Sequence, residues 1–359
     1  ILNPNEEDIA DYHNKQDIYR LQQRELFTMR QLEPMTRDGK FITLHANIEL
    51  PQEAEKVQDF GATGIGLYRS EFLFFGSSLP TRQEQCEAYK HILNSLAPNP
   101  VTIRTLDSGG DKLVSELSLS NEANPFMGWR SIRVCLDREE LFKDQLKALL
   151  QANEKGNLRI LLPMISGLPE LRKSKEHIKT CLAELAEEGI ECPSVEIGIM
   201  IEVPAAVMQV EQLAKEADFF SIGTNDLIQF TLAVDRSNEM IADMFQPHHP
   251  AILNMIYNTV IAAHKEGIPV AVCGEMSADP FSILLLIGLG VDELSMTPWS
   301  IMEAKKIIRS INYEDVNEIA LRTLRFDDAA SVDSFLHQRF AQAFADLGIT
   351  SYVPAQKIN

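Results

Sequence analysis

The sequence predicts a closed, parallel (β/α)₈ TIM barrel, because eight short apolar runs alternate with helix-like segments along the 359 residues. The runs are nearly continuously apolar, as expected for parallel strands that are buried on both faces. Most of them end in a charged or polar residue. The eight predicted strands cover residues 42–47, 64–69, 101–104, 158–163, 197–202, 219–226, 270–273 and 293–296.

Helix signals fill the segments between these runs. One predicted helix opens at Pro204 and runs to Leu213, and two others cover residues 168–189 and 251–267, each ending at a glycine. The third strand is followed by a long insertion, residues 107–138. It lies on the side of the barrel where long loops usually carry function.

The predicted barrel runs from about residue 41 to residue 299, within a domain that covers residues 33–359 and ends in terminal helices. The sequence predicts one polar helix over residues 1–32, with only a thin stripe of apolar residues along it. Such a stripe suits a connecting helix from an upstream domain, and packing of this helix on the barrel explains it equally well.

Composition narrows the possible functions. The net charge of −19 argues against a general surface for nucleic acids or anionic membranes, because both bind basic proteins. No apolar run approaches the roughly 18 residues of a membrane helix, and no signal peptide is recognisable. The five cysteines include no Cys-x-x-Cys pair, which favours a reducing compartment, the cytoplasm, without disulfides or structural zinc.

The residues at the strand ends are candidates for the active site, because in this fold the active site lies where the strands end. These candidates are Asn47, Arg69, Arg104, Glu202, Asn225, Asp226 and Cys273. Arg69 and Arg104 suggest an anionic ligand, since a guanidinium at the barrel mouth is costly unless an anion meets it. Arg130 and Arg236 could converge on the same place. A structural salt bridge is the alternative, above all for Arg236, which follows Asp235.

Glu202 and Asp226 are predicted metal ligands. Adjacent strands lie about 4.8 Å apart, so the two carboxylates can converge on one ion. Two carboxylates, phosphate oxygens and water suit Mg²⁺. The alternatives are helix capping by Asp226 and a salt bridge from Glu202 to a strand-end arginine.

Cys273 is the predicted proton donor, because a thiol at a strand end can exchange a proton with a substrate carbon. An ordinary buried cysteine is the alternative. Among the histidines, His45 is more simply a core residue, and His248 and His249 are more simply loop residues than metal ligands.

Eight motifs, in order along nearly the whole chain, resemble the phosphoenolpyruvate-binding domain of the enzyme I family. These are the phosphoenolpyruvate–protein phosphotransferases of the bacterial phosphotransferase system. Within the family, the chain looks closer to the nitrogen-related branch. The motifs cover residues 66–73, 104–107, 109–112, 124–130, 201–204, 219–227, 233–236 and 273–276.

The resemblance implies a role for each candidate. Cys273 would protonate the enolate that remains when phosphoenolpyruvate loses its phosphoryl group. Glu202 and Asp226 would hold Mg²⁺. The residues implied to bind the phosphate and carboxylate of phosphoenolpyruvate are Arg69, Arg104, Asn225 and Arg236, with Arg130 near the phosphate.

One departure from the family is informative. The acceptor histidine of the family lies in an upstream domain, in a Thr-Ser-His setting that this sequence lacks. The helical domain that docks the histidine-bearing phosphocarrier protein is missing as well. We therefore expect the C-terminal half of such an enzyme, which binds phosphoenolpyruvate and Mg²⁺ but needs the upstream half for transfer. The resemblance also implies a homodimer.

Three alternatives remain open. A pyruvate phosphate dikinase or phosphoenolpyruvate synthase has a similar C-terminal barrel, although no Walker A loop is present in this sequence. A Mg²⁺-enolate aldolase also uses paired carboxylates and an arginine, but it would not need Cys273. A phosphoenolpyruvate sensor that reports through dimerisation would need no proton donor.

Overall fold

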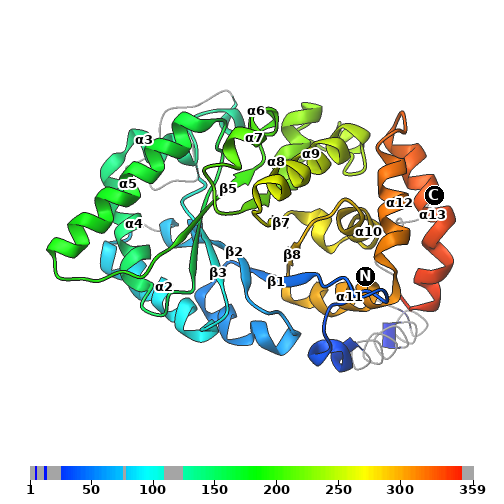
Figure 1. The fold of residues 1–359 in the computed structure, drawn as a ribbon, viewed down its shortest axis with the longest axis horizontal. Helices are drawn as coiled ribbons and strands as arrows, with labels where there is room; N and C mark the ends of the chain where they lie inside the picture. Colours follow the sequence, from blue (N-terminus) through cyan, green and yellow to red (C-terminus); the bar gives the residue numbers. More distant parts are fainter. Residues whose placement is uncertain (1–4, 6–11, 14–25, 76–77, 109–123, 350–359) are drawn as a thin grey trace.

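The computed structural model describes residues 5, 12–13, 26–75, 78–108 and 124–349 (Figure 1). The predicted motif at residues 109–112 and most of the helix predicted over residues 1–32 lie outside this part. Among the described residues of segment 1–32, residues 12–13 and 26–28 are helical, and Met29–Gln31 form the 3₁₀ helix η1. The Lys305 ammonium fixes this segment to the barrel, because Nζ donates to the carbonyl oxygens of Arg30 (2.8 Å) and Gly61 (3.2 Å).

The predicted barrel is confirmed. Eight strands form one closed ring in chain order, and every neighbouring pair is parallel. The strands are β1 (Thr43–Ile48), β2 (Ile65–Arg69), β3 (Val101–Arg104), β4 (Leu158–Leu162), β5 (Glu196–Ile201), β6 (Phe220–Ile222), β7 (Val270–Val272) and β8 (Glu293–Met296).

The sixth predicted strand was too long. Strand β6 ends at Ile222, and Asn225 and Asp226 lie in the first turn of a helix that starts at Thr224. Pairing with β5 and β7 stops at Ile222, and the polar Gly-Thr-Asn-Asp sequence that follows suits a helix start. Both side chains still lie at the carboxyl end of the barrel.

Helices surround the ring of strands, and the C-terminal helices α12 and α13 lie at one edge of the molecule (Figure 1). The α-helices are α2 (Arg82–Leu96), α3 (Ile132–Asp137), α4 (Glu139–Ala152), α5 (Leu168–Glu187), α6 (Pro204–Met208), α7 (Val210–Leu213), α8 (Thr224–Leu232), α9 (Pro250–Glu266), α10 (Pro280–Gly288), α11 (Pro298–Ser310), α12 (Tyr313–Thr323) and α13 (Ala329–Asp346). Further 3₁₀ helices are η2 (Pro51–Phe60), η3 (Ser70–Phe74), η5 (Pro125–Met127), η6 (Ala242–Met244) and η7 (Glu275–Ala278).

Two helix predictions hold and one needs correction. Helices α5 and α9 match the predicted segments, and Gly267 ends α9 in the left-handed conformation, with φ of 76°. The helix predicted from Pro204 to Leu213 is instead divided into α6 and α7 at Gln209. The Gln209 side chain donates to the carbonyl oxygen of Ser166 (3.2 Å), which ties this break to the loop after β4.

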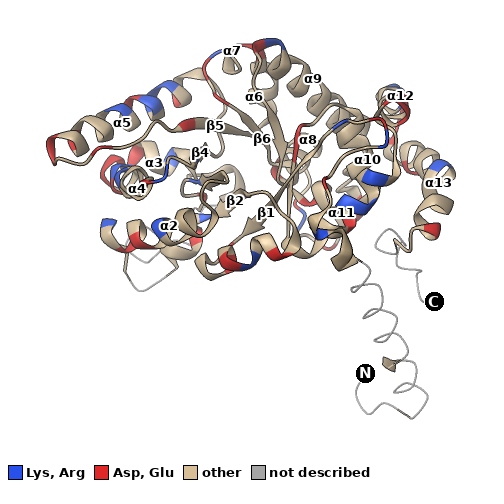
Figure 2. Cartoon of the chain, turned by 60° about the horizontal axis from the view of Figure 1, so that its bottom comes forward, with Lys and Arg blue, Asp and Glu red and all other residues tan. Residues whose placement is uncertain are grey.

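Apolar side chains of the strands and the inner faces of the helices form one continuous core. Acidic and basic residues both lie along α5 (Figure 2). Within the described residues, no helix is both long and apolar enough to cross a membrane.

Buried charges fill the amino-terminal end of the barrel. Glu293 at the start of β8 receives two hydrogen bonds from Arg159 of β4 (3.2 and 3.1 Å) and lies 3.2 Å from Nδ1 of His45. The Arg159 guanidinium also lies over the Phe219 ring, 5.1 Å from its centroid. Burial raises the pKa of Glu293, but His45 and Arg159 lower it overall to about 2. His45 is therefore a paired core residue, as predicted.

Helix α13 is held against the barrel by a buried histidine. His248, just before α9, lies with Nδ1 2.6 Å from Oδ1 of Asp333 on α13 and with Nε2 2.8 Å from Oγ of Ser282 on α10. Asp279, which caps α10, lies 3.7 Å from Nε2. Burial lowers the pKa of His248, but its contacts with Asp279 and Asp333 raise it overall to about 9.

These contacts predict a pH-dependent stability. An unfolded histidine titrates near pH 6.5, so the stabilisation by charged His248 is complete below about pH 6.5 and is lost as the pH rises through about 9. We expect the melting temperature of His248→Gln to fall less over this range than that of the wild type. Parallel profiles for wild type and His248→Gln would contradict the assignment.

Candidate active site

A cavity of ≈ 380 Å³ opens at the carboxyl end of the barrel. Its walls come from strand ends, from the segment after β3 and from the loops that follow β6 and β7. Eight of the nine candidates line this one cavity: Arg69, Arg104, Arg130, Glu202, Asn225, Asp226, Arg236 and Cys273.

Strand register places the first two arginines side by side. Arg69 is the last residue of β2 and Arg104 is the last residue of β3, and the two are direct partners in the parallel ladder. Two other strand ends contribute in the same way, because Glu202 lies one residue after β5 and Cys273 lies one residue after β7. The closed barrel therefore turns positions that are distant in sequence into one ring.

The Arg104 side chain is only 13% exposed and pairs with two carboxylates. Its Nη2 donates to Oε1 of Glu71 (3.0 Å), and its Nη1 lies 2.8 Å from Oδ2 of Asp107. Nε of Arg104 is buried and has no hydrogen-bond partner within the described chain, and the same holds for Oγ of Ser108. Both residues line the cavity, and a buried polar atom without a partner is unusual in a folded protein.

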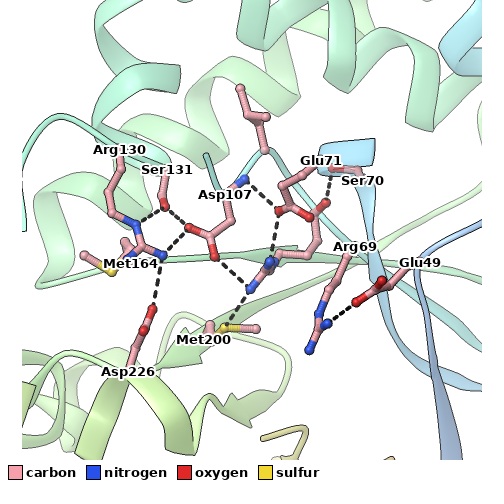
Figure 3. Close-up of polar contacts among 12 residues, drawn as sticks. Glu49, Arg69, Ser70, Glu71, Asp107, Arg130, Ser131, Met164, Met200 and Asp226 are labelled. Atoms are coloured by element: carbon pink, nitrogen blue, oxygen red, sulfur yellow. Dashed lines mark hydrogen bonds and ion pairs between the residues drawn. The ribbon is translucent and has the colours of Figure 1, made fainter. Parts of the chain in front are cut away.

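Arg130 reaches the cavity from the insertion after β3. Its Nη2 donates to Oδ1 of Asp107 (2.9 Å) and to Oδ2 of Asp226 (3.1 Å), so it connects the β3 and β6 sides of the mouth (Figure 3). The neighbouring Ser131 has φ of 54°, a strained value for a residue with a side chain, and its hydroxyl donates to Asp107. These contacts direct Arg130 inward.

The other two arginines form exposed pairs at the rim. Arg69 pairs with Glu49, and their side chains are 37% and 44% exposed. Nη1 of Arg236 donates to Oε1 of Glu275 (2.9 Å), and these side chains are 44% and 75% exposed. Asn225 also donates to Oε1 of Glu275, at 3.1 Å.

Glu202 is buried and surrounded by acids. Its Oε1 accepts a hydrogen bond from the backbone N–H of Met164 (2.6 Å). A Cβ at position 223 would lie only 2.8 Å from Oε2, so glycine at that position leaves room for the carboxylate. Burial, together with the charges of Asp107 and Asp226, raises the pKa of Glu202 well above its usual value.

The lining carries more acids than arginines. Four arginines and six carboxylic acids face the cavity, all from described residues. No group of three or more His, Cys, Asp or Glu side chains in the described chain is arranged for a metal ion. Glu202 and Asp226 nonetheless fit Mg²⁺ as partial ligands, because they are hard oxygen donors and Mg²⁺ normally takes its other ligands from substrate and water. A cation would also offset the excess of acids.

Cys273 lies in an apolar floor formed with Leu67, Leu161, Met200 and Phe219. Its sulfur accepts a hydrogen bond from the Ser221 hydroxyl (3.3 Å). Burial raises the pKa of this thiol, so it is protonated at neutral pH and can donate a proton.

Two of the alternatives concern contacts that the structure shows. Arg236 pairs with Glu275 and not with the adjacent Asp235, whose carboxylate accepts from Ser237. The carboxylate of Asp226 pairs with Arg130, although the residue lies in the first turn of α8.

Asn47 does not line the cavity. Its side chain donates to the carbonyl oxygens of Cys273 (3.0 Å) and Ser295 (3.2 Å). It therefore joins β1 to the ends of β7 and β8.

Sequence reasoning missed the acids that hold the arginines: Glu49, Glu71, Asp107 and Glu275. A usable signal existed for two of them. Glu71 follows Arg69 by two residues and Asp107 follows Arg104 by three, both within segments already selected for their arginines. Glu71 nevertheless pairs with Arg104 of the next strand, and no spacing rule predicts that partner.

The buried network predicts a stability difference between two arginines. Arg104→Ala leaves Glu71 without its cationic partner in a buried site, so the free energy of unfolding at pH 7.5 should fall by about 3 kcal/mol. The loss should shrink as the pH falls, because burial raises the pKa of Glu71 and protonation removes its charge. Urea unfolding followed by circular dichroism measures both effects. Arg236→Ala, from an exposed pair, should lose little, and equal losses for the two variants would contradict this difference.

Residues 23–313 match the family model described as "PEP-utilising enzyme, PEP-binding domain". Three relatives carry the name phosphoenolpyruvate-protein phosphotransferase. The relative from Staphylococcus carnosus is 44% identical over 90% of this chain and 57% of its own length. The relative from Geobacillus stearothermophilus is 44% identical over 96% and 60%, and that from Listeria monocytogenes is 42% identical over 95% and 60%.

A citrate lyase structure from Burkholderia xenovorans covers 90% of this chain and 98% of its own, with 16% identity and a TM-score of 0.46, which is too low to support an inference. The chain spans about 60% of the length of the curated relatives it matches. The match over residues 23–313 and the 42–44% identity show that this chain belongs to the family of PEP-binding domains of PEP-utilising enzymes.

Proposed function

We propose that this chain binds phosphoenolpyruvate with Mg²⁺ at the barrel mouth. It would support transfer of the phosphoryl group to a histidine on an upstream domain, with release of pyruvate, as the first step of a phosphotransferase relay. The observation that carries the proposal is the convergence of four arginines, two oxygen-donor acids and a buried thiol in one cavity. The names of the relatives support the same reaction.

Arginine chemistry suits this substrate. Phosphoenolpyruvate carries a phosphate and a carboxylate, and a guanidinium binds either group with two parallel hydrogen bonds. Arg69, Arg104, Asn225 and Arg236 would bind these groups, with Arg130 near the phosphate. The unpaired Nε of Arg104 supports this role, because it is a buried donor in the cavity wall.

Glu202 and Asp226 would hold Mg²⁺, which neutralises charge on the phosphoryl oxygens when it is bound. Glu202 directly follows β5 and Asp226 lies in the first turn after β6, so the two acids come from the same, carboxyl end of neighbouring parallel strands. Arg130 already contacts Asp226, so the phosphate and the metal would share one wall of the cavity.

Proton transfer falls to Cys273. Transfer breaks the bond between phosphorus and the enol oxygen, and the electron pair stays on that oxygen as an enolate. The thiol then gives its proton to the terminal carbon, which yields pyruvate and a thiolate that regains a proton from water. Arg104 stabilises the thiolate, because its charge lowers the pKa of Cys273 against the effect of burial.

The partner is the remaining part of the proposal. The acceptor would be a histidine outside this sequence, which would take the phosphoryl group from phosphoenolpyruvate and pass it to a histidine-bearing phosphocarrier protein. The greater length of the relatives leaves room for such a domain. Homodimerisation through this barrel stays a prediction from the family resemblance.

Calorimetric titration of phosphoenolpyruvate, with and without Mg²⁺, tests the binding site. We expect Mg²⁺-dependent binding that Arg104→Ala and Glu202→Ala each weaken by at least about 30-fold, because each removes a buried charge from the site. Arg172→Ala, an exposed arginine on α5 paired with Glu216, is the matched control and should bind as the wild type does. Absence of binding to folded wild type would refute the proposal.

Proton transfer can be measured without the acceptor domain. In D₂O with Mg²⁺, the chain should exchange the methyl protons of pyruvate, because the thiol and thiolate of Cys273 interconvert pyruvate and its enolate. We expect Cys273→Ala to bind phosphoenolpyruvate within a factor of about three and to lose exchange by about 100-fold or more. Proton NMR of pyruvate follows the exchange. Full exchange in Cys273→Ala would assign the proton to another group.

A further inference from the structure

The arginines of the cavity fall into two classes. Arg104 and Arg130 are buried and bound to the largely buried acids Glu71 and Asp107. Arg69 and Arg236 lie at the rim, each paired with an acid that is itself exposed. Breaking a buried pair leaves an unsolvated charge, whereas an exposed pair separates at little cost. An incoming anion can therefore displace the rim acids but not the buried ones.

The carboxylate of Glu275 binds Arg236 and Asn225 as an anionic ligand would. One oxygen, Oε1, accepts from Nη1 of Arg236 (2.9 Å) and from Nδ2 of Asn225 (3.1 Å). The backbone N–H of Glu275 donates to Oδ1 of Asn225 (3.1 Å), which turns the amide nitrogen toward the same oxygen. Two donors proposed for substrate thus converge on one internal carboxylate.

Glu49 occupies Arg69 in a similar way. Glu49 directly follows β1, and its carboxylate accepts from Nη1 of Arg69. Its backbone N–H is fixed by Glu53 (2.8 Å), so the main chain stays in place when the side chain turns away. The side chain is 44% exposed, which gives it solvent to turn into.

We propose that Glu49 and Glu275 are intramolecular placeholders that compete with substrate for the site. In the free protein they occupy Arg69 and the Arg236–Asn225 pair, and they leave when substrate binds. A ligand with two anionic groups, such as an organic phosphate with a carboxylate, has to replace both acids. A ligand with one anionic group, such as inorganic phosphate or pyruvate, has to replace only one, so the placeholders lower its affinity by less. The inference rests on the proposed function for the identity of the substrate.

The test is calorimetric titration of wild type, Glu49→Gln, Glu275→Gln and the double variant with phosphoenolpyruvate, inorganic phosphate and pyruvate. Each single variant should bind phosphoenolpyruvate about 2- to 5-fold more tightly, the range expected for an exposed ion pair. In the double variant, phosphoenolpyruvate should gain more than inorganic phosphate, because it replaces both acids and phosphate replaces only one. Unchanged or weaker binding in both single variants would overturn the proposal.

Three further variants separate contact from charge. Glu275→Asp keeps the charge but shortens the reach, and it should also tighten binding. Asp235→Asn removes a neighbouring charge that contacts Ser237 and not Arg236, and it should change binding less than Glu275→Gln. Glu71→Gln removes a buried partner of Arg104 and should weaken binding. Tightening by Asp235→Asn equal to that by Glu275→Gln would reduce the effect to net charge and refute the placeholder contact.

The two proposals fail in different ways. If wild type binds no phosphoenolpyruvate, the proposed function is refuted, and the placeholder inference is then decided by inorganic phosphate alone. Tighter phosphate binding by the double variant than by wild type would support it. Equal phosphate binding by the two proteins would refute it.

Discussion

The carboxylate of Asp107 organises the cavity, because it binds two guanidinium groups that would otherwise repel each other. Arg104 reaches it from the end of β3, and Arg130 reaches it from the insertion that follows. Burial raises the pKa of Asp107, but the two arginines outweigh this effect and hold it well below its usual range. The acid therefore stays charged and holds two flexible side chains in place, and the proposed phosphoryl transfer would depend on such positioning.

Charge balance links this network to the rest of the cavity. With six acids facing four arginines, the free site is not a simple anion receptor. Burial and the nearby charges of Asp107 and Asp226 raise the pKa of Glu202, which favours its neutral form and reduces the excess of negative charge. In the proposed function, Mg²⁺ supplies the missing positive charge, and the rim acids leave. Binding of substrate is then an exchange of partners within a nearly neutral site.

The barrel provides the rigid support that such an exchange needs. The thiol of Cys273 lies in an apolar floor below the charged ring, so the proton donor and the anion-binding groups occupy different layers of one cavity. At the opposite end, Arg159 and His45 neutralise the buried Glu293. Outside the barrel, His248 lies just before α9 and contacts Asp333 on α13 and Ser282 on α10, so it connects these helices. The elements around the site are thereby fixed independently of ligand.

The sequence by itself determined the barrel and the ring of site residues, because strand order and strand ends are local properties. Apolar runs mark the strands, and closure brings their ends together, which is why Arg69, Arg104 and Cys273 could be placed in advance. The split at Gln209 and the early end of β6 were missed, since both depend on pairing and contacts outside the segment. Only the tertiary structure assigned each arginine its acid: Glu71 pairs across strands and Glu275 across loops, and partner choice follows distance in space and not spacing in sequence.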